Sequence, residues 1–497
     1  MPEIRLDRPL TWRQVGAIAE GDLPTLSPAA RGRVQAAHRL LQSIVAQGIR
    51  AYGVNTGVGA LCDVIVAPSK QRQLSRNIVM STAAGVGPPL EGCAVRAIIA
   101  AAVNNFAHGY SGVRVEVVEQ LIALLAHECI PEVPAKGSVG YLSHMAHIAG
   151  VLLGAGHARL RGERRGALEA LRAAGLKPLV LEAKEGLSLV NGTPCATGMT
   201  ALALLRIERL LDWADLIGAM SFENLHGQVS AFEPEGLNLR VSAALWRVGE
   251  RLRAALRGSA ILEASAGRRT QDPLSLRAMP QVHAAVREQF EQASAVADAE
   301  LASVTDNPAL LGAVESPRAF SEAHAVGAAL ALSADALGIA VAELAAMSER
   351  RIDRLVNPLV SGLPAFLASD SGVDSGFMIA QYTAVALVAE NRRLAAPASL
   401  DGGITSGLQE DHLSHATSAA LKLLEILKHA EIIFSIEMLA AAQAYDLQPD
   451  GRARAPKTDA VYRAVRERIA QYRDDRPLAE DIERACELLR ARRPADL

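Results

Sequence analysis

The chain has 497 residues and a net charge of −3, with 51 Lys and Arg against 54 Asp and Glu, which excludes the strong single-sign field of a nucleic-acid or anionic-membrane binder. Half of the residues are apolar and 21% are charged, which excludes a disordered chain and indicates a large core. Only 4% are aromatic, whereas alanine and leucine, the strongest helix formers, dominate, so composition favours an all-α protein.

Glycine-rich turns divide the first part of the chain. Residues 53–59 and 137–140 read as loops between short helices, since glycine supplies the backbone angles that tight turns need. We therefore predict a loop-rich helical N-terminal domain over residues 1–200.

Long amphipathic helices are expected from residue 201 onward. Apolar side chains recur at helical spacing over residues 207–217, 282–297 and 337–347. These stripes are typical of core packing and predict an elongated helical bundle domain over residues 201–497.

Residues 325–347 form the most membrane-like stretch of the sequence. Asp335 and Glu343 interrupt it, and each would be costly in hydrocarbon. A core helix of a multi-helix bundle explains the stretch better than a membrane span, so no membrane partner is predicted.

Cysteine spacing and the N-terminus bear on the compartment. The five cysteines are scattered singly and form no CxxC pair, which favours a reducing environment over a disulfide framework or a cysteine metal site. Residues 1–5 do not begin a signal peptide, because no basic region followed by an apolar core is present. We expect a cytoplasmic protein.

Several segments are unusually rich in polar side chains for core or turn sequences. Singly, each is most simply read as a turn or a helix cap. They lie at residues 52–59, 191–193, 271–277, 303–308 and 409–412.

Taken together, these segments resemble the histidine and phenylalanine ammonia-lyase family. The similarity runs from about Ile4 to the C-terminus and adds ordered matches at residues 83–87, 137–140, 184–187, 348–352 and 375–381. The resemblance implies a nearly all-helical ammonia-lyase (fumarase/aspartase-like) fold. It also implies a homotetramer whose active sites are built from more than one subunit.

The segment that carries the family's electrophile departs from the pattern. In the family, an Ala-Ser-Gly triplet cyclises into a methylidene-imidazolone, whereas this chain has Tyr141, Leu142 and Ser143 after an intact approach over residues 137–140. Leu142 has no hydroxyl to lose, and Ser143 replaces the glycine whose missing Cβ permits ring closure. We therefore predict no methylidene-imidazolone and no other cofactor.

Other positions either depart from the family or keep its residues. By the resemblance, Leu274 occupies the position of the family's second active-site tyrosine, and Thr82 occupies that of the histidine that recognises the imidazole of the substrate. Ala325 corresponds, in a looser alignment, to a phenylalanine near the electrophile. By the resemblance, Tyr52 is the catalytic base and Arg277 clamps the substrate carboxylate with its two-pronged guanidinium. The remaining matches line the same pocket and are Asn191, Gln271 and Glu410.

Two histidines that the family lacks follow the lost triplet. His144 and His147 share a helix face, and a helix N-terminus at His144 would lower its pKa and favour the neutral base. Packing is the simpler interpretation of both residues, and metal binding together with His324 or Glu410 is a third.

These observations predict an ammonia-lyase-like enzyme that works without the electrophile. It would act by acid/base chemistry on a small carboxylate-bearing substrate, by elimination, addition, isomerisation or cyclisation. Tyr52, His144 and Glu410 would be catalytic, and Tyr141 and Ser143 would add pocket contacts. We expect negligible deamination of histidine or phenylalanine, because proton transfer contributes only about 10²–10⁴-fold. The alternatives are a non-catalytic tetrameric binding homologue and a metal-assisted lyase using His144 and His147.

Overall fold

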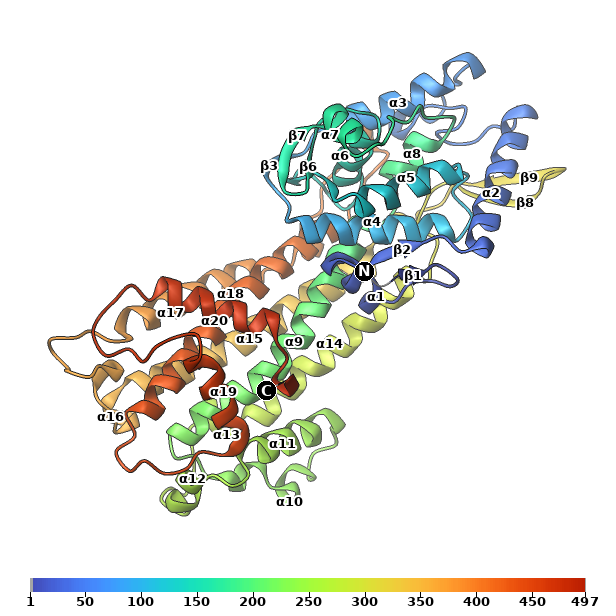
Figure 1. The fold of residues 1–497 in the computed structure, drawn as a ribbon. Coiled ribbons are helices and arrows are strands. Elements are labelled where there is room, and N and C mark those ends of the chain that lie inside the picture. Colours follow the sequence, from blue (N-terminus) through green and yellow to red (C-terminus); the bar gives the residue numbers. More distant parts are fainter. Residues whose placement is uncertain (1–2, 497) are drawn as a thin grey trace. The chain divides into compact units, whose positions relative to one another are not determined.

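The computed structural model describes residues 3–496, most of which lie in helices (Figure 1). The first half contains β1 (Glu3–Arg5), α1 (Trp12–Glu20), β2 (Leu23–Thr25), α2 (Pro28–Ala46), α3 (Gln71–Thr82), β3 (Val86–Pro89), α4 (Gly92–Ala107), α5 (Val115–Ala126), β4 (Cys129–Pro131), β5 (Pro134–Lys136), α6 (Ser143–Leu152), β6 (His157–Leu160), β7 (Glu163–Gly166), α7 (Ala167–Ala173), α8 (Glu185–Val190) and α9 (Pro194–Asn224). The second half contains α10 (Pro234–Leu237), α11 (Ala243–Leu256), α12 (Ala260–Ser265), α13 (Leu274–Arg277), α14 (Met279–Leu301), β8 (Ala309–Ala313), β9 (Ser316–Phe320), α15 (Ala328–Val356), α16 (Pro358–Ser361), α17 (Met378–Leu394), α18 (Ala416–Asp446), α19 (Pro456–Arg466) and α20 (Ala479–Ala491).

The predicted helical fold is confirmed, including the three long amphipathic segments. Residues 207–217, 282–297 and 337–347 lie inside α9, α14 and α15. The strands form only small sheets: the parallel pair β1–β2, the antiparallel pairs β3–β5 and β8–β9, and the three-stranded β4-β6-β7. In Figure 1 the β8–β9 hairpin lies beside α2, with which both strands are in contact.

The chain forms two compact units, each assembled from separate segments. Unit 1 comprises residues 1–205, 293–335 and 397–421, and unit 2 comprises residues 206–292, 336–396 and 422–497. The predicted domain boundary at residue 200 stays a prediction. The units show in addition that two later segments pack with the N-terminal residues.

Helix α4 is the central element of unit 1. Nearly all of its residues from Ala94 to Ala107 are buried, so the helix is apolar all round and packs on every side. A Cβ at Gly198 of α9 would lie 2.6 Å from the backbone of Ala97, so the glycine allows the two helices to pack closely. This core holds the loops that form the site described below.

Unit 2 is a bundle of long helices with a polar layer inside it. The carboxylate of Glu437 on α18 accepts bonds from the Arg351 guanidinium on α15, at 2.5 and 2.9 Å, and from the Ser221 hydroxyl on α9, at 2.6 Å. All three side chains are fully buried. Asp215 and His283 form a second buried pair at 2.8 Å. Because buried charges must be paired, these contacts fix the helices to one another.

Helix α15 agrees with the prediction of a core helix. Among residues 3–496 it is the one helix that is long and apolar enough to cross a membrane, judged by length and composition. Within its most apolar window, 61% of the residues are buried inside the protein. Core packing accounts for that burial, and the compartment stays a prediction.

Candidate functional site

Unit 1 contains a cavity of about 870 Å³ that collects half of the predicted site residues. It lies between the turn after α2, the end of α3, the loop before α6, the end of α8 and the loop before α18. The predicted residues that line it are Tyr52, Thr82, Tyr141, Asn191 and Glu410.

Tyr52 is held in the cavity by a turn that requires glycine. The Gly59 amide donates a hydrogen bond of 2.8 Å to the Tyr52 hydroxyl oxygen. Gly59 has a φ of 55°, and a Cβ there would lie 2.1 Å from the Ser406 hydroxyl, so a larger residue does not fit. Burial raises the pKa of Tyr52, and the charge of Glu410 adds to this rise, while the Gly59 bond opposes it. The phenol therefore keeps its proton at neutral pH.

Tyr141 and Glu410 face each other across the same cavity. Burial raises the pKa of Tyr141 to about 12, and the charge of Glu410, the neighbouring Tyr52 and a hydrogen bond with Glu410 act in the same direction. The Thr405 hydroxyl donates a bond of 2.6 Å to Oε2 of Glu410. The two phenols and the carboxylate thus form one cluster, which we call the phenol–carboxylate cluster.

The loop before α6 places Tyr141 in this cluster. The Ser138 hydroxyl of this loop donates a hydrogen bond of 3.0 Å to the Tyr141 carbonyl, and the Thr417 hydroxyl donates one of 2.7 Å to the Gly140 carbonyl. Gly140 has a φ of 148°, and a Cβ there would lie 2.7 Å from the Ser414 hydroxyl. The loop is therefore tied to the start of α18, which follows Glu410 in the chain.

Asn191 stands at the end of α8 against a buried ion pair. Its side-chain amide donates 2.8 Å to the Asn307 carbonyl. Behind it, the Lys184 ammonium bonds Asp306 at 2.9 Å, with both side chains fully buried. Burial lowers the pKa of Lys184, and Asp306 counteracts the shift. The segments after α8 and before β8 are thereby held together.

His144, Ser143 and His147 are buried or half-buried beside the cavity but do not line it. Nε2 of His144 donates 3.1 Å to the Ala135 carbonyl, and Nε2 of His147 accepts 3.1 Å from the Gly85 amide. The pKa of His144 is lowered to about 4, mainly by burial of the imidazole and not by the helix dipole that the sequence predicts as the cause. The catalytic role of His144 stays a prediction.

Gln271, Leu274 and Arg277 belong to unit 2 and do not line the cavity of unit 1. Gln271 is exposed, and Leu274 on α13 is 63% exposed. Across residues 3–496 the structure gives the Arg277 guanidinium neither a hydrogen bond nor an ion pair.

The sequence analysis missed several residues that line the cavity. Arg50 and Asp63 form an exposed ion pair of 2.5 Å at its edge, and Glu322 pairs with His324 at 3.1 Å. Arg50 stands two residues before Tyr52, which is a weak signal. Glu322 follows β9, and the sequence around it contains no motif that points to a site.

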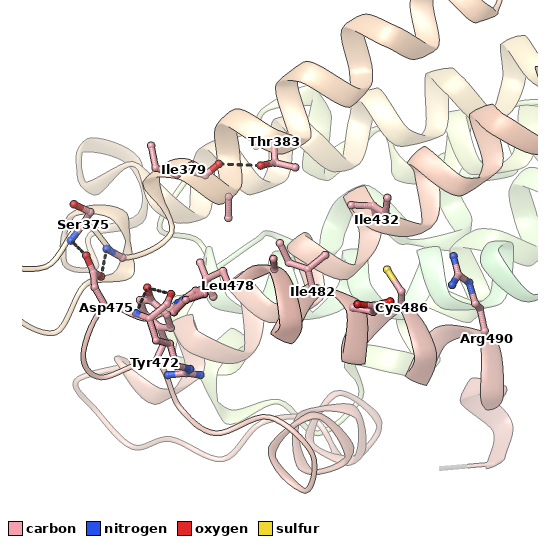
Figure 2. A pocket seen from close by; sticks show the side chains of 16 residues that line it. Ser375, Ile379, Thr383, Ile432, Tyr472, Asp475, Leu478, Ile482, Cys486 and Arg490 are labelled. Atoms are coloured by element: carbon pink, nitrogen blue, oxygen red, sulfur yellow. Dashed lines mark hydrogen bonds between the residues drawn. The ribbon is translucent and has the colours of Figure 1, made fainter. Parts of the chain in front are cut away.

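Unit 2 contains a second cavity of about 810 Å³, shown in Figure 2. Ile482 and Cys486 of α20 line it together with Leu478, the residue just before that helix, opposite Ile379 of α17. Two of its charged side chains, Asp475 and Arg490, are bonded within unit 2. The Asp475 carboxylate accepts the Ser375 amide at 2.8 Å and the Gly376 amide at 3.0 Å, and Arg490 bonds Glu431 at 2.6 Å.

No metal centre emerges from the described residues. Within residues 3–496, no group of three or more His, Cys, Asp or Glu side chains is arranged so that it could hold a metal ion. Nε2 of His144 and Nε2 of His147 are already bonded to backbone groups.

Relatives with known names cover almost the whole chain. A histidine ammonia-lyase of Stigmatella aurantiaca is 43% identical over 92% of this chain and 90% of its own length. A histidine ammonia-lyase of Symbiobacterium thermophilum is 41% identical over 98% of this chain and 97% of its own length. The crystal structure of a histidine ammonia-lyase from Trypanosoma cruzi superposes with a TM-score of 0.91, at 34% identity, over 99% of this chain and 94% of that one.

These relatives overturn the function predicted from the sequence. An enzyme without efficient histidine deamination was expected, yet proteins that are 41–43% identical over nearly the full length carry the name histidine ammonia-lyase. The prediction gave the replaced triplet more weight than the likeness along the rest of the chain. The two alternatives, a non-catalytic homologue and a metal-assisted lyase, are withdrawn with it.

A family model completes the comparison. The model described as aromatic amino acid lyase matches residues 10–467, which is most of the chain. The predicted family is thereby confirmed, and the chain belongs to the aromatic amino acid lyases.

Proposed function

We propose that this chain is a lyase that eliminates ammonia from histidine or a closely related amino acid, with Tyr52 as the base. The phenol–carboxylate cluster in the cavity of unit 1 carries the proposal. It places a proton acceptor, Tyr52, beside a carboxylate that can neutralise a cationic substrate. The names of the relatives give the reaction.

The chemistry balances with the groups present. In the fraction of molecules in which Tyr52 has lost its own proton to solvent, the phenolate takes a proton from Cβ of the amino acid, and the electrons of that C–H bond form the double bond between Cα and Cβ. The electron pair of the C–N bond leaves with ammonia, so histidine gives urocanate. The Gly59 amide, 2.8 Å from the Tyr52 oxygen, stabilises the negative charge that the base must carry.

The substrate carboxylate has a proposed partner in Arg277. A planar guanidinium binds a carboxylate through two parallel bonds, and this one has no partner among residues 3–496. Because Arg277 and Gln271 belong to unit 2 and Leu274 is largely exposed, we propose a cytoplasmic homotetramer whose active sites draw on more than one subunit.

We also propose that the enzyme carries no methylidene-imidazolone. Three features support this: Leu142 offers no hydroxyl, Ser143 begins α6, and the Tyr141 phenol is engaged with Glu410. These residues do not fit a ring built from Ala-Ser-Gly. A cationic imidazole of the substrate can draw electron density from Cβ, and the carboxylates of the cavity favour the cationic ring.

The test is the conversion of histidine by the purified full-length protein, followed by the absorbance of urocanate. Phenylalanine and tyrosine serve as comparison substrates. Formation of urocanate that disappears in Tyr52→Phe supports the proposal, and absence of any elimination from histidine contradicts it. The intact mass of the same sample should equal that of the linear chain. A loss of two water molecules would contradict the proposed absence of the ring.

A further inference from the structure

Two histidines on α6 each bond one side of the β3–β5 pair. Nε2 of His144 donates a hydrogen bond of 3.1 Å to the Ala135 carbonyl of β5. Nε2 of His147 accepts one of 3.1 Å from the Gly85 amide, which directly precedes β3. The two strands run antiparallel and pair with each other. The histidines, about one helical turn apart, therefore attach both sides of the strand pair to the same helix.

The two imidazoles have opposite tautomers. A carbonyl can only accept, so Nε2 of His144 carries the proton, and a backbone amide can only donate, so Nε2 of His147 carries none. Burial lowers the pKa of both rings, so both are neutral at and above neutral pH. Each neutral ring thereby presents the group that its partner requires.

The segment before β3 passes directly against α6. A Cβ at Gly85 would lie 3.0 Å from Nε2 of His147 and 3.0 Å from the Ser143 hydroxyl, so the segment has little room for a side chain. The glycine thus lets the backbone approach the helix closely enough to bond His147.

The attached segments lead to residues that line the cavity of unit 1. Thr82, the last residue of α3, lines the cavity three residues before Gly85. Tyr141 lines it in the loop that runs from β5 to α6. A shift of the strand pair away from α6 would move these side chains, although neither His144 nor His147 lines the cavity itself.

We propose that His144 and His147 are positioning residues, which hold the β3–β5 pair on α6 and thereby set where Thr82 and Tyr141 stand in the cavity. Both histidines are absent from the family pattern, so this attachment belongs to the chain in which the triplet is replaced. The inference rests on the proposed function only in taking histidine as the substrate of the test.

The bond of His147 depends on pH, whereas that of His144 does not. Protonation turns Nε2 of His147 into a donor that faces the Gly85 amide, so this bond is lost as the pH falls below about 6.5. Burial moves the loss to lower pH, because it lowers the pKa of the ring. A protonated His144 keeps its bond, since Nε2 donates to the Ala135 carbonyl in either state.

Several ionisable groups stand near His147. They are His144 on its own helix, His157, Glu132 and Arg164 in the small cavity that His147 lines, and Lys136 of β5, whose side chain lies beside Gly87. Glu132 and Arg164 bond each other at 2.7 Å. Among the described residues, α3 contributes only Met80 to that small cavity, and α7 and α8 contribute none. Burial is therefore the main influence on His147, and it favours the neutral ring.

The test compares two substitutions of His147 in the full-length protein. His147→Leu removes the acceptor, whereas His147→Gln keeps one, because the side-chain oxygen of glutamine can take the place of Nε2. At about pH 8 we expect KM for histidine to rise about 5–30-fold in His147→Leu, since the Gly85 amide loses its partner. His144→Leu should raise KM by a similar factor through β5. His147→Gln should stay within about threefold of the wild type.

A pH series separates the His147 bond from a merely structural role of the side chain. The ratio of KM for the wild type to KM for His147→Gln should be constant above about pH 6.5 and rise below it, because only the wild-type ring gains a proton. Titration of the substrate cancels in this ratio. His157→Leu is the matched control, because His157 lines the same small cavity while its side chain holds neither strand, so KM should stay unchanged.

Hydrogen exchange of residues 83–87, followed by mass spectrometry at about pH 8, reports on the His147 bond without activity. Exchange should be faster in His147→Leu than in the wild type and unchanged in His147→Gln and His157→Leu. Unchanged KM and exchange in folded His147→Leu, a flat KM ratio across pH, or an equal effect of His157→Leu would overturn the inference. If His147→Leu does not fold, the KM ratio of the wild type and His147→Gln decides.

The inference and the proposed function can fail separately. If histidine is not deaminated but hydrogen exchange follows these expectations, the proposed function fails and the attachment of the strand pair stands. If urocanate forms while KM and exchange are normal in every variant, the reverse holds.

Discussion

The two cavities of the molecule have similar volumes, about 870 Å³ in unit 1 and about 810 Å³ in unit 2, but different chemistry. In unit 1, Glu410 and Asp411 face the cavity without a cationic partner among residues 3–496. In unit 2, Asp475 is bonded to two backbone amides and Arg490 to Glu431. Volume alone therefore does not identify a reactive site.

The difference shows how a cavity comes to be available for chemistry. A charged group that is paired with an opposite charge within the fold stabilises the fold, whereas one without a charged partner is available to a charged ligand. The carboxylate of the phenol–carboxylate cluster has no cationic partner among residues 3–496, whereas Asp475 and Arg490 of the unit 2 cavity are bonded within their own unit. Four experiments can break or sharpen this contrast.

The largest effect is expected from Tyr52→Phe. Removing the phenol oxygen removes the proton acceptor, so kcat/KM for histidine should fall by about 10²–10⁴-fold. Thermal unfolding should change little, because one hydrogen bond is worth about 1 kcal/mol. Steady-state kinetics of this variant beside Tyr110→Phe, a change at the surface of unit 1 outside the cavity, give the comparison. Activity that survives in Tyr52→Phe would show that Tyr52 is not the base.

Arg277→Ala should cost about 10–100-fold, mostly through a higher KM, because a charged hydrogen bond to the carboxylate is lost. Arg277→Lys should recover only part of the loss, since an ammonium cannot form the two parallel bonds. Separate kcat and KM values measure the effect. An unchanged KM in the alanine variant would show that Arg277 does not bind the substrate carboxylate.

The pH profile should rise into the alkaline range. Burial raises the pKa of Tyr52, so the phenolate fraction, and with it kcat/KM, should grow about tenfold per pH unit below that pKa. Glu410→Gln removes a charge that raises the pKa, so the rising limb should move to lower pH. A limb that stays in place in Glu410→Gln would show that Glu410 does not act on Tyr52.

The smallest catalytic effect is expected from Ile482→Ala in the cavity of unit 2. The half-buried side chain should cost about 1–2 kcal/mol of stability, less than the about 2–5 kcal/mol of a fully buried one. Histidine turnover should stay within about twofold, as for changes away from functional groups. Denaturant unfolding and kinetics measure the two quantities. Lost turnover in a stable variant would give this cavity a catalytic role.

Much of the fold could be predicted from sequence periodicity and motif order. The apolar stripes over residues 207–217, 282–297 and 337–347 lie in helices because burial of one face stabilises them. Half of the site was also predictable, since Tyr52, Asn191 and Glu410 match family motifs. The pairing of Tyr141 with Glu410 was not, because it joins residues far apart in the sequence through a loop held by Gly140 and Thr417.

By itself, the sequence determined the helical class, the family and the replacement of the triplet by Tyr141, Leu142 and Ser143, because these depend on residue types and their order. Tertiary structure decided which polar groups have partners. In the folded chain, His144 and His147 are bonded to backbone groups, and Glu410 faces the cavity without a cationic partner among residues 3–496. The physical reason is that hydrogen bonds and ion pairs depend on distances across the fold, which residue order does not specify.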